Sequence, residues 1–354
     1  MTLQDIIARH RTRFLAQRGH TLTPEQWSAL NAIEGCRSGP YGQVEWACSD
    51  CRHTHRSFNS CGHRSCNQCQ SASTQTWLDR QTAKLLPVTY FMATFTLPAE
   101  LRALAKARPE PLYRLLMATA ADTLKTFAQN DAALNGEIGF CAVLHTHTRR
   151  LDYHPHVHIV VPGGALNRRR RQWRKAKGGY LFNGKALARV FRGKLLRALG
   201  EAGLTAPTTP PKWVVQCQKV GRGQEALRYL ARYLYRGVIS NHNILEDDGE
   251  RITFRYRESK THQLKTRTVP AEEFIDLILQ HTLPKGFRRA RDYGFLHGNA
   301  RQTLKVVQWV FKVAIPNPDA KRRKAKIVCP KCQCSMHFVH LHRASPTPAP
   351  TPPE

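Results

Sequence analysis

Acidic residues and long apolar runs are both scarce in this sequence of 354 residues. Asp and Glu number 25 against 55 Lys and Arg, so the formal charge is +30. A chain this far from neutrality is typical of proteins that bind a polyanion, and nucleic acid is the leading candidate. No stretch approaches the roughly 20 apolar residues that cross a bilayer, so the sequence indicates neither export nor membrane insertion. We therefore expect a cytoplasmic protein.

A phosphate-binding loop of the form GxxxxGK[ST] is also absent, as is any internal repeat of fixed period. The missing loop argues against a nucleotide-driven helicase domain. The composition is otherwise ordinary, with 41% hydrophobic and 23% charged residues, which excludes disorder throughout the chain. The length predicts two or three domains of roughly 100–200 residues each.

The order of predicted elements in the middle of the chain indicates an α+β domain. Apolar patterns predict strands at 88–97, 138–147, 156–161 and 213–218, with helices within 100–129, at 185–202 and at 224–235. This order, βαββαβα, suits an antiparallel sheet with helices, related to ferredoxin-like folds. Further along, the turn-forming residues 247–249 mark a predicted hairpin with strands at 252–256 and 264–269. Residues 271–280 are predicted to be helical.

The cysteines indicate a zinc module. Cys48-x2-Cys51 and Cys66-x2-Cys69 are separated by fourteen residues, and two such pairs can close a tetrahedral thiolate site around one Zn²⁺. Four thiolates leave no open position, so this ion would be structural. Cys61 and His63 lie between the pairs and could replace a ligand or build a second site. The alternative is a set of free thiols without metal.

A second cysteine cluster lies near the C-terminal end. Cys329, Cys332 and Cys334 are close to several histidines and could form another zinc knuckle, although the pattern is short. We divide the chain into a helical lead-in with a zinc-binding domain, a core with a tyrosine-bearing helix, a hairpin and helical part, and a basic, Cys/His-containing, proline-rich tail. These segments are 1–86, 87–240, 241–315 and 316–354; the proline-rich end at 345–354 is not expected to fold.

A histidine pair marks one strand of the core. Residues two apart in a strand share a face, so His156 and His158 would present two imidazoles side by side, a half-site for a divalent cation with open positions. A third ligand could come from His145 or His147 on the preceding strand. The alternative is that these are buried histidines without a ligand role.

Two tyrosines, Tyr229 and Tyr233, are spaced to share one face of a predicted helix. At this spacing tyrosines are often packing residues. A tyrosine that attacks phosphorus would instead form a phosphotyrosine and conserve the energy of the phosphodiester. With a free pKa of about 10, the phenol needs deprotonation or a nearby metal ion.

A basic tract follows the histidine strand directly. Its cations and central Trp suit a single-stranded nucleic-acid backbone with one stacked base. The alternative is a solvated loop that binds any polyanion. The candidate DNA-binding residues are Arg168, Arg169, Arg170, Arg171, Trp173, Arg174 and Lys175.

Together these motifs resemble the rolling-circle insertion-sequence transposases of the HUH (histidine–hydrophobic–histidine) nuclease superfamily, of the two-tyrosine type with an N-terminal zinc-binding domain. The motifs occur in the family's order over about residues 5–315. They are the cysteine module ending at 59–69, the strand at 95–98, Leu144-His145-Thr146, His154-Pro155-His156-Val157-His158, Tyr229-x3-Tyr233, and the segments 283–289 and 293–296.

The resemblance implies a ferredoxin-like HUH nuclease core in which His156 and His158 bind Mg²⁺ or Mn²⁺. Tyr229 and Tyr233 would be nucleophiles that form 5′-phosphotyrosine intermediates with single-stranded DNA. His145 matches a family position beside the metal strand and is our choice of third ligand, with Gln218 and Glu225 as alternatives. The family's usual Cys-Pro-x-Cys knuckle is Cys66-Asn67-Gln68-Cys69 here, which keeps the thiolates but makes the turn less rigid.

We expect a metal-dependent single-strand endonuclease and strand transferase that nicks DNA at element ends, holds it covalently and rejoins it at a target. It would associate with the nucleoid when bound to DNA. A rolling-circle replication initiator or a relaxase-type nickase could use the same nuclease core. In a different class, a non-catalytic zinc-dependent nucleic-acid-binding regulator would also explain the charge and the cysteine pairs, but it would not need paired histidines and tyrosines.

Overall fold

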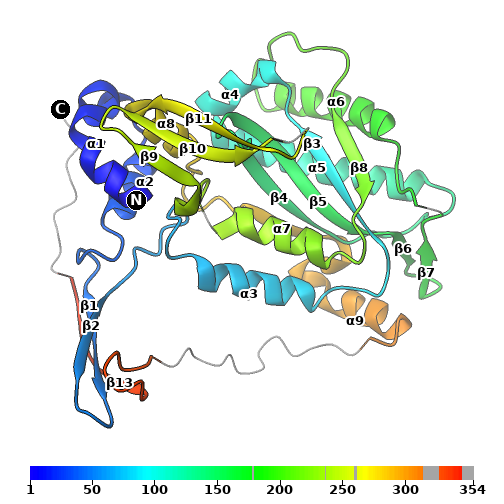
Figure 1. Ribbon diagram of the computed structural model, residues 1–354. Helices are drawn as coiled ribbons and strands as arrows, with labels where there is room; N and C mark the ends of the chain where they lie inside the picture. The colour runs from blue at the N-terminus through cyan, green and yellow to red at the C-terminus, as the bar shows by residue number, and fades with distance from the viewer. Residues whose placement is uncertain (178, 236, 259–260, 314–326, 345–354) are drawn as a thin grey trace. The chain divides into compact units, whose positions relative to one another are not determined.

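The computed structural model describes residues 1–177, 179–235, 237–258, 261–313 and 327–344 (Figure 1). The chain forms two compact units. The first contains the described residues of Met1–Ser73, Tyr235–Thr282 and Asp319–Glu354, and the second contains those of Thr74–Leu234 and Leu283–Pro318. Among the described helices, none is both long and apolar enough to span a bilayer. The basic run at 321–326 and the proline-rich end at 345–354 lie outside the described residues.

The second unit is built on a five-stranded antiparallel sheet in the order β12-β4-β5-β3-β8. Its strands are β3 (Tyr90–Thr96), β4 (Phe140–His147), β5 (Tyr153–Pro162), β8 (Val215–Lys219) and β12 (Ala290–Tyr293). The first four correspond to the predicted strands of the core, which confirms the α+β fold class. The edge strand β12 has no counterpart in the prediction, because four residues reading Ala-Arg-Asp-Tyr show no apolar alternation.

Helices α4 (Arg102–Ala107), α5 (Pro109–Asn130) and α6 (Gly184–Glu201) pack on one face of this sheet and form the main core with it (Figure 1). Phe95 of β3 lies edge to face against Phe191 of α6, with ring centroids 5.0 Å apart. Each such buried side chain contributes roughly 1.5–3 kcal/mol to stability. Because successive strand residues alternate between faces, Thr94, His156 and His158 lie on the opposite face.

The edge strand β12 is fixed by polar contacts and by a glycine. Its Asp292 accepts hydrogen bonds from Gln81, on α3 (Ser71–Thr82), at 3.1 Å and from Lys84 at 2.6 Å. Gly294 follows with a φ of +58°, and a Cβ at this position would collide with the carbonyl oxygen of Ile138. Only glycine therefore fits this turn. The following Phe295 packs in a small cluster with Val307 of α9 (Arg301–Val310).

Among its described residues, the first unit contains three complete α-helices and, as the larger of its parts, a three-stranded sheet packed with them. The helices are α1 (Leu3–Arg18), α2 (Pro24–Glu34) and α8 (Ala271–Leu279), and the sheet has the order β11-β10-β9, with β9 (Ile244–Asp247), β10 (Arg251–Arg257) and β11 (Leu264–Pro270). The predicted hairpin and the helix at 271–280 correspond to β10, β11 and α8. Short 3₁₀ helices at Gly19–Thr21, Ala99–Leu101, Asn241–Asn243, Gly294–Leu296 and Gly298–Ala300 connect elements along the chain.

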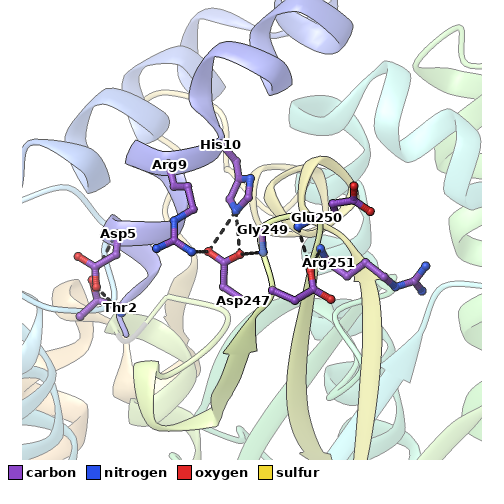
Figure 2. A network of polar contacts seen from close by, with 9 residues as sticks. Thr2, Asp5, Arg9, His10, Asp247, Gly249, Glu250 and Arg251 are labelled. Atoms are coloured by element: carbon purple, nitrogen blue, oxygen red, sulfur yellow. Dashed lines mark hydrogen bonds and ion pairs between the residues drawn. The ribbon is translucent and has the colours of Figure 1, made fainter.

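Figure 2 shows how α1 is tied to the β9–β10 turn within the first unit. The buried carboxylate of Asp247 accepts a hydrogen bond from Nε2 of His10 at 3.0 Å and pairs with Arg9 at 3.2 Å. It also accepts the backbone N–H of Gly249 at 3.0 Å, which shapes the predicted turn at 247–249. A buried carboxylate with several donors is held firmly, so this contact fixes the helix against the hairpin.

A separate small sheet in the first unit pairs a hairpin from the N-terminal part of the chain with a strand from its C-terminal part. Strands β1 (Gln43–Cys48) and β2 (Thr54–Phe58) form a hairpin, and β13 (Met336–His342) pairs antiparallel with β1 on its other side. Part of the tail is therefore ordered as a strand. In the second unit, the remaining strands β6 (Gly164–Asn167) and β7 (Gln172–Lys175) form a hairpin that contains the basic tract.

Candidate active site and metal clusters

Three histidines converge on the face of the sheet opposite the main core. Strands β4 and β5 place His145 directly opposite His156, and His158 follows two residues later on the same face. The ring centroids of the three lie 4.4 to 5.2 Å apart, and one nitrogen of each lies within 4.8 Å of one nitrogen of the others. Their exposed fractions are only 1%, 9% and 7% in chain order. We call this set the histidine cluster.

Two hydrogen bonds orient the rings of the histidine cluster. Nδ1 of His156 lies 2.6 Å from the carbonyl oxygen of His154, which can only accept, so Nδ1 carries the proton and Nε2 keeps its lone pair. Nδ1 of His158 lies 2.9 Å from the hydroxyl of Thr94, its cross-strand neighbour on β3. Partners of this kind hold a metal-binding imidazole in the required orientation.

Burial keeps these imidazoles neutral. It lowers the pKa of His156 to about 4 and lowers the pKa of His145 and of His158 well below their usual value. The guanidinium of Arg289, whose Nε donates to the carbonyl of Leu144 at 2.9 Å, lowers the pKa of His145 and of His156 further. Near neutral pH the cluster therefore offers three uncharged nitrogen ligands, a donor set that fits a divalent cation and leaves coordination positions open.

Helix α7 (Gln224–Tyr235) brings one predicted nucleophile to the histidine cluster. The ring centroid of Tyr229 lies 5.7 Å from that of His158 and 6.2 Å from that of His145. The apolar face of the helix is buried, so packing sets the direction in which Tyr229 points. The buried leucines of this face are Leu227, Leu230 and Leu234.

Among the described histidines and carboxylates, neither His147 nor Glu225 belongs to this group. Gln218 is exposed on β8, and Glu225 is exposed at the start of α7. His147 lies beyond a bulge in β4, and its ring centroid is 6.5 Å from that of His145. The side chain of Tyr233 lies outside the described residues. Sequence reasoning did not assign roles to Thr94, which has no motif of its own, or to Arg289, which ends the segment 283–289. Each reaches the site only through strand pairing.

The thiols form two groups, and neither is the main predicted site of Cys48, Cys51, Cys66 and Cys69. The sequence also left open a second site with Cys61 and a C-terminal knuckle, and cysteines from both occur in these groups. The first thiol cluster is Cys36, Cys61, Cys66 and Cys69, and the second thiol cluster is Cys48, Cys51, Cys329 and Cys332. The structure does not bring the two CxxC pairs near the N-terminus together. The reason is the β1–β2 hairpin: its turn carries Cys48 and Cys51, and a strand of five residues is roughly 17 Å long. Cys36 stands alone in the sequence, so no spacing pattern pointed to it.

The first thiol cluster has the features of a structural zinc site. Sγ of Cys61 and Sγ of Cys69 lie 3.6 Å apart, and the backbone N–H of His63 donates to Cys61 at 3.4 Å. Side-chain hydrogen bonds from neighbouring thiols, first that of Cys61, lower the pKa of Cys66 to about 5, which favours a thiolate. Four thiols at this distance fit one tetrahedral Zn²⁺. His63 contributes its backbone to the turn and is not a member of the group.

Asn67 gives a physical reason for the unusual knuckle of this cluster. Its side-chain amide donates to Oδ1 of Asn241 at 2.7 Å and to the carbonyl oxygen of Ile239 at 3.2 Å. A proline at this position could make neither bond. The rigidity that proline would give to the turn is replaced by these two bonds to another segment of the same unit.

The basic tract lies on the β6–β7 hairpin. Arg168, Arg169, Arg170 and Arg171 are exposed at its turn, and Arg168 pairs with Glu137. The β7 residue Lys175 is exposed and Arg174 is half-buried. The indole of Trp173 packs against the rings of Phe295 and Phe311, with centroids 6.0 and 5.2 Å apart. Packing thus occupies this ring, and the exposed arginines are the groups that face solvent.

Two regions of the chain match known families. Residues 6–97 match the transposase zinc-binding domain, and residues 139–303 match a family described as putative transposases. The first thiol cluster lies in the first range, and the histidine cluster and Tyr229 lie in the second. The chain belongs to the insertion-sequence transposases with an N-terminal zinc-binding domain, which confirms the resemblance seen in the motifs.

Among similar proteins are two transposases. The chain is 37% identical over 342 residues to the putative transposase y4qJ of Sinorhizobium fredii, which covers 89% of this chain and 85% of the relative. It is 27% identical over 310 residues to the transposase for insertion sequence element IS801 of Pseudomonas savastanoi pv. phaseolicola, which covers 81% of this chain and 74% of the relative.

Proposed function

We propose that this transposase nicks and rejoins single-stranded DNA through 5′-phosphotyrosine intermediates during rolling-circle transposition of an insertion sequence. The observation that carries the proposal is the convergence of the Tyr229 ring with the histidine cluster, 5.7 Å from His158. Replication initiators and relaxase-type nickases could use the same chemistry, but the family match favours transposition. A purely DNA-binding regulator has no use for a phenol beside three neutral imidazoles.

In the first step, Oη of Tyr229 attacks the phosphorus of the scissile phosphodiester. The Tyr–O–P bond forms, the bond from phosphorus to O3′ breaks, the phenol gives up its proton and the leaving O3′ gains one. The DNA is left with a free 3′-OH and a 5′-phosphate joined to the tyrosine. Attack by a 3′-OH on this phosphotyrosine reverses the exchange and joins the strand at a new position.

In this proposal the histidine cluster would bind the catalytic metal ion. Mg²⁺ or Mn²⁺ bound there would stabilise negative charge on the phosphoryl oxygens. His156 and His158 are held by His154 and Thr94, so their nitrogens need little reorganisation before they bind a ligand. His145 completes the group from the neighbouring strand. The protein would act on DNA in the nucleoid.

The test is detection of a covalent adduct. Labelled single-stranded DNA carrying an element end is incubated with the protein and Mn²⁺ and then separated by denaturing electrophoresis. We expect a protein–DNA adduct that maps to Tyr229 or Tyr233 by mass spectrometry, and we expect Tyr229→Phe to abolish the adduct at position 229. Tyr180→Phe, a change at a surface tyrosine that is 54% exposed, is the matched control and should cleave normally.

Two results would contradict the proposal. One is the absence of any adduct with every element-end sequence under conditions in which the protein binds DNA. The other is unchanged cleavage in Tyr229→Phe, in Tyr233→Phe and in the double variant.

The exposed turn of the β6–β7 hairpin leads to a prediction about salt dependence. Each cation that contacts a phosphate of single-stranded DNA contributes about 0.7 to the slope of log K against log salt. We therefore expect replacement of both Arg169 and Arg170 by glutamine to reduce that slope by about 1.4 in a titration followed by fluorescence anisotropy. Arg197→Gln, at an exposed arginine on α6, is the control. An unchanged slope in the double variant would remove this turn from the DNA interface.

A further inference from the structure

We propose that the second thiol cluster is a structural zinc site that joins the C-terminal segment of the chain to the N-terminal zinc module. Cys48 and Cys51 come from the turn of the β1–β2 hairpin, and Cys329 and Cys332 precede β13. The matched zinc-binding domain ends at residue 97, so half of the ligands of this site lie far outside it. The inference does not depend on the proposed strand-transfer chemistry.

The sulfur atoms are spaced for a single ion. Sγ of Cys48 lies 3.4 Å from Sγ of Cys332, and Sγ of Cys51 lies 3.6 Å from Cys329 and 3.5 Å from Cys332. Four thiolates around one Zn²⁺, each about 2.3 Å from the metal, would be roughly 3.8 Å apart. A disulfide requires about 2.05 Å between two partners, and all of these cysteines are free. The sulfurs are also too close together to enclose an iron–sulfur cluster.

The backbone around these cysteines is arranged as a pair of zinc knuckles. The N–H of Asp50 donates to Sγ of Cys48, and the N–H of Lys331 donates to Sγ of Cys329, both at 3.4 Å. The same pattern occurs at Cys61 and Cys66 in the first thiol cluster. Such bonds orient a ligating sulfur and stabilise its negative charge. Two clusters of one chain therefore share one local geometry.

Strand pairing brings the two knuckles together. β13 pairs with β1 from the Cys48–Met336 pair to the Gln43–His342 pair. Within the second knuckle, the N–H of Cys329 donates to the carbonyl oxygen of Cys334 at 2.8 Å. The apolar cluster at the site is small and includes three of the proposed ligands: Cys48, Cys329 and Met336 are buried, with Trp46, Ile327 and Cys332 packed against them. A core of this size is too small to hold the strands alone, so a metal ion is the stabilising element.

A competing grouping supplies a control. Asp50, Cys332 and Cys334 also lie within reach of a common ion, but two of these residues are outside the four-thiol group and one is an exposed carboxylate. In our proposal Cys334 is not a ligand. Cys334→Ser therefore changes the same knuckle with the same chemistry as Cys329→Ser, without removing a ligand.

The experiment measures zinc content and thiol protection in the full-length protein. We expect elemental analysis to find about two zinc ions per chain, one for each four-thiol cluster. Cys329→Ser should lose one of the two, and Cys334→Ser should keep both. A second measurement uses brief alkylation of the protein without substitutions, followed by mass spectrometry. Alkylation should spare Cys48, Cys51, Cys329 and Cys332 together and should modify Cys334. This second readout needs no variant to fold.

Several results would overturn the proposal. They are a single zinc ion in the unmodified protein, two ions in Cys329→Ser, an equal loss in Cys334→Ser, or rapid alkylation of Cys48 and Cys51 while Cys36 and Cys66 stay protected. Iron in place of zinc in the elemental analysis would also contradict it.

Discussion

Replacing His158 with alanine is expected to lower the rate of single-strand cleavage by roughly a thousandfold or more, which corresponds to about 4 kcal/mol in the activation barrier. His158 is the member of the histidine cluster that lies nearest to the Tyr229 ring and is held by Thr94. Its loss leaves His145 and His156 as the only nitrogen donors of the group. Two imidazoles bind a divalent cation far more weakly than three, so both metal binding and cleavage should fall.

The measurement combines cleavage kinetics with calorimetric titration of Mn²⁺. His147→Ala is the matched control, because His147 is a buried histidine on the same strand as His145, β4, but lies outside the cluster. It should retain metal affinity and cleavage within a few-fold. If His158→Ala cleaves at the normal rate with saturating Mn²⁺, the cluster does not support the reaction.

The second large effect is expected at the first thiol cluster. Zinc binding to small structural sites has an apparent free energy of about 10–16 kcal/mol, and the folding of the module depends on it. Cys66→Ser should therefore lose one zinc ion per chain and expose residues 36–69 to protease. Cys36→Ser should have the same effect, because Cys36 belongs to the same cluster. Limited proteolysis with elemental analysis provides the measurement.

This prediction distinguishes the observed grouping from the one expected from spacing. If Cys48, Cys51, Cys66 and Cys69 shared one ion, Cys36→Ser would keep its zinc and Cys48→Ser would release the same ion as Cys66→Ser. Cys217→Ser, at a cysteine of β8 outside both clusters, should keep its full metal content. Retention of zinc by Cys36→Ser would refute the first thiol cluster as described.

The parts of the fold with strong local patterns could be predicted from the sequence. Apolar alternation identified β3, β4, β5 and β8, and helical periodicity identified α6 and α7. The hairpin β6–β7 was not identified, because each strand has only four residues, GALN and QWRK, with no apolar alternation, and the turn between them is a run of arginines. The strand β12 was not predicted either. The residue that marks its end is Gly294, but the reason for a glycine there is the nearby carbonyl oxygen of Ile138, which is visible only in the folded structure.

The candidate sites were predictable to the extent that their residues are close in sequence. The pairing of His156 and His158 follows from the two-residue period of a strand; the neighbouring strand left His145 and His147 open, and the choice of His145 came from the family resemblance. The thiol groups were not predictable in this way, because a hairpin separates pairs that look adjacent and strand pairing joins pairs that are 278 and 284 residues apart. Local spacing carries no information about such long-range pairing.

The place of β13 beside β1 also affects how the protein is made. Cys332 lies 284 residues after its partner Cys48. The ribosome needs roughly 15–60 s to synthesise that length of chain. Until then β1 has an open edge, where another nascent chain could pair with it. A copy of the gene with an early stop codon would lack β13, so β1 would stay an edge strand and the second thiol cluster would lose two of its four cysteines.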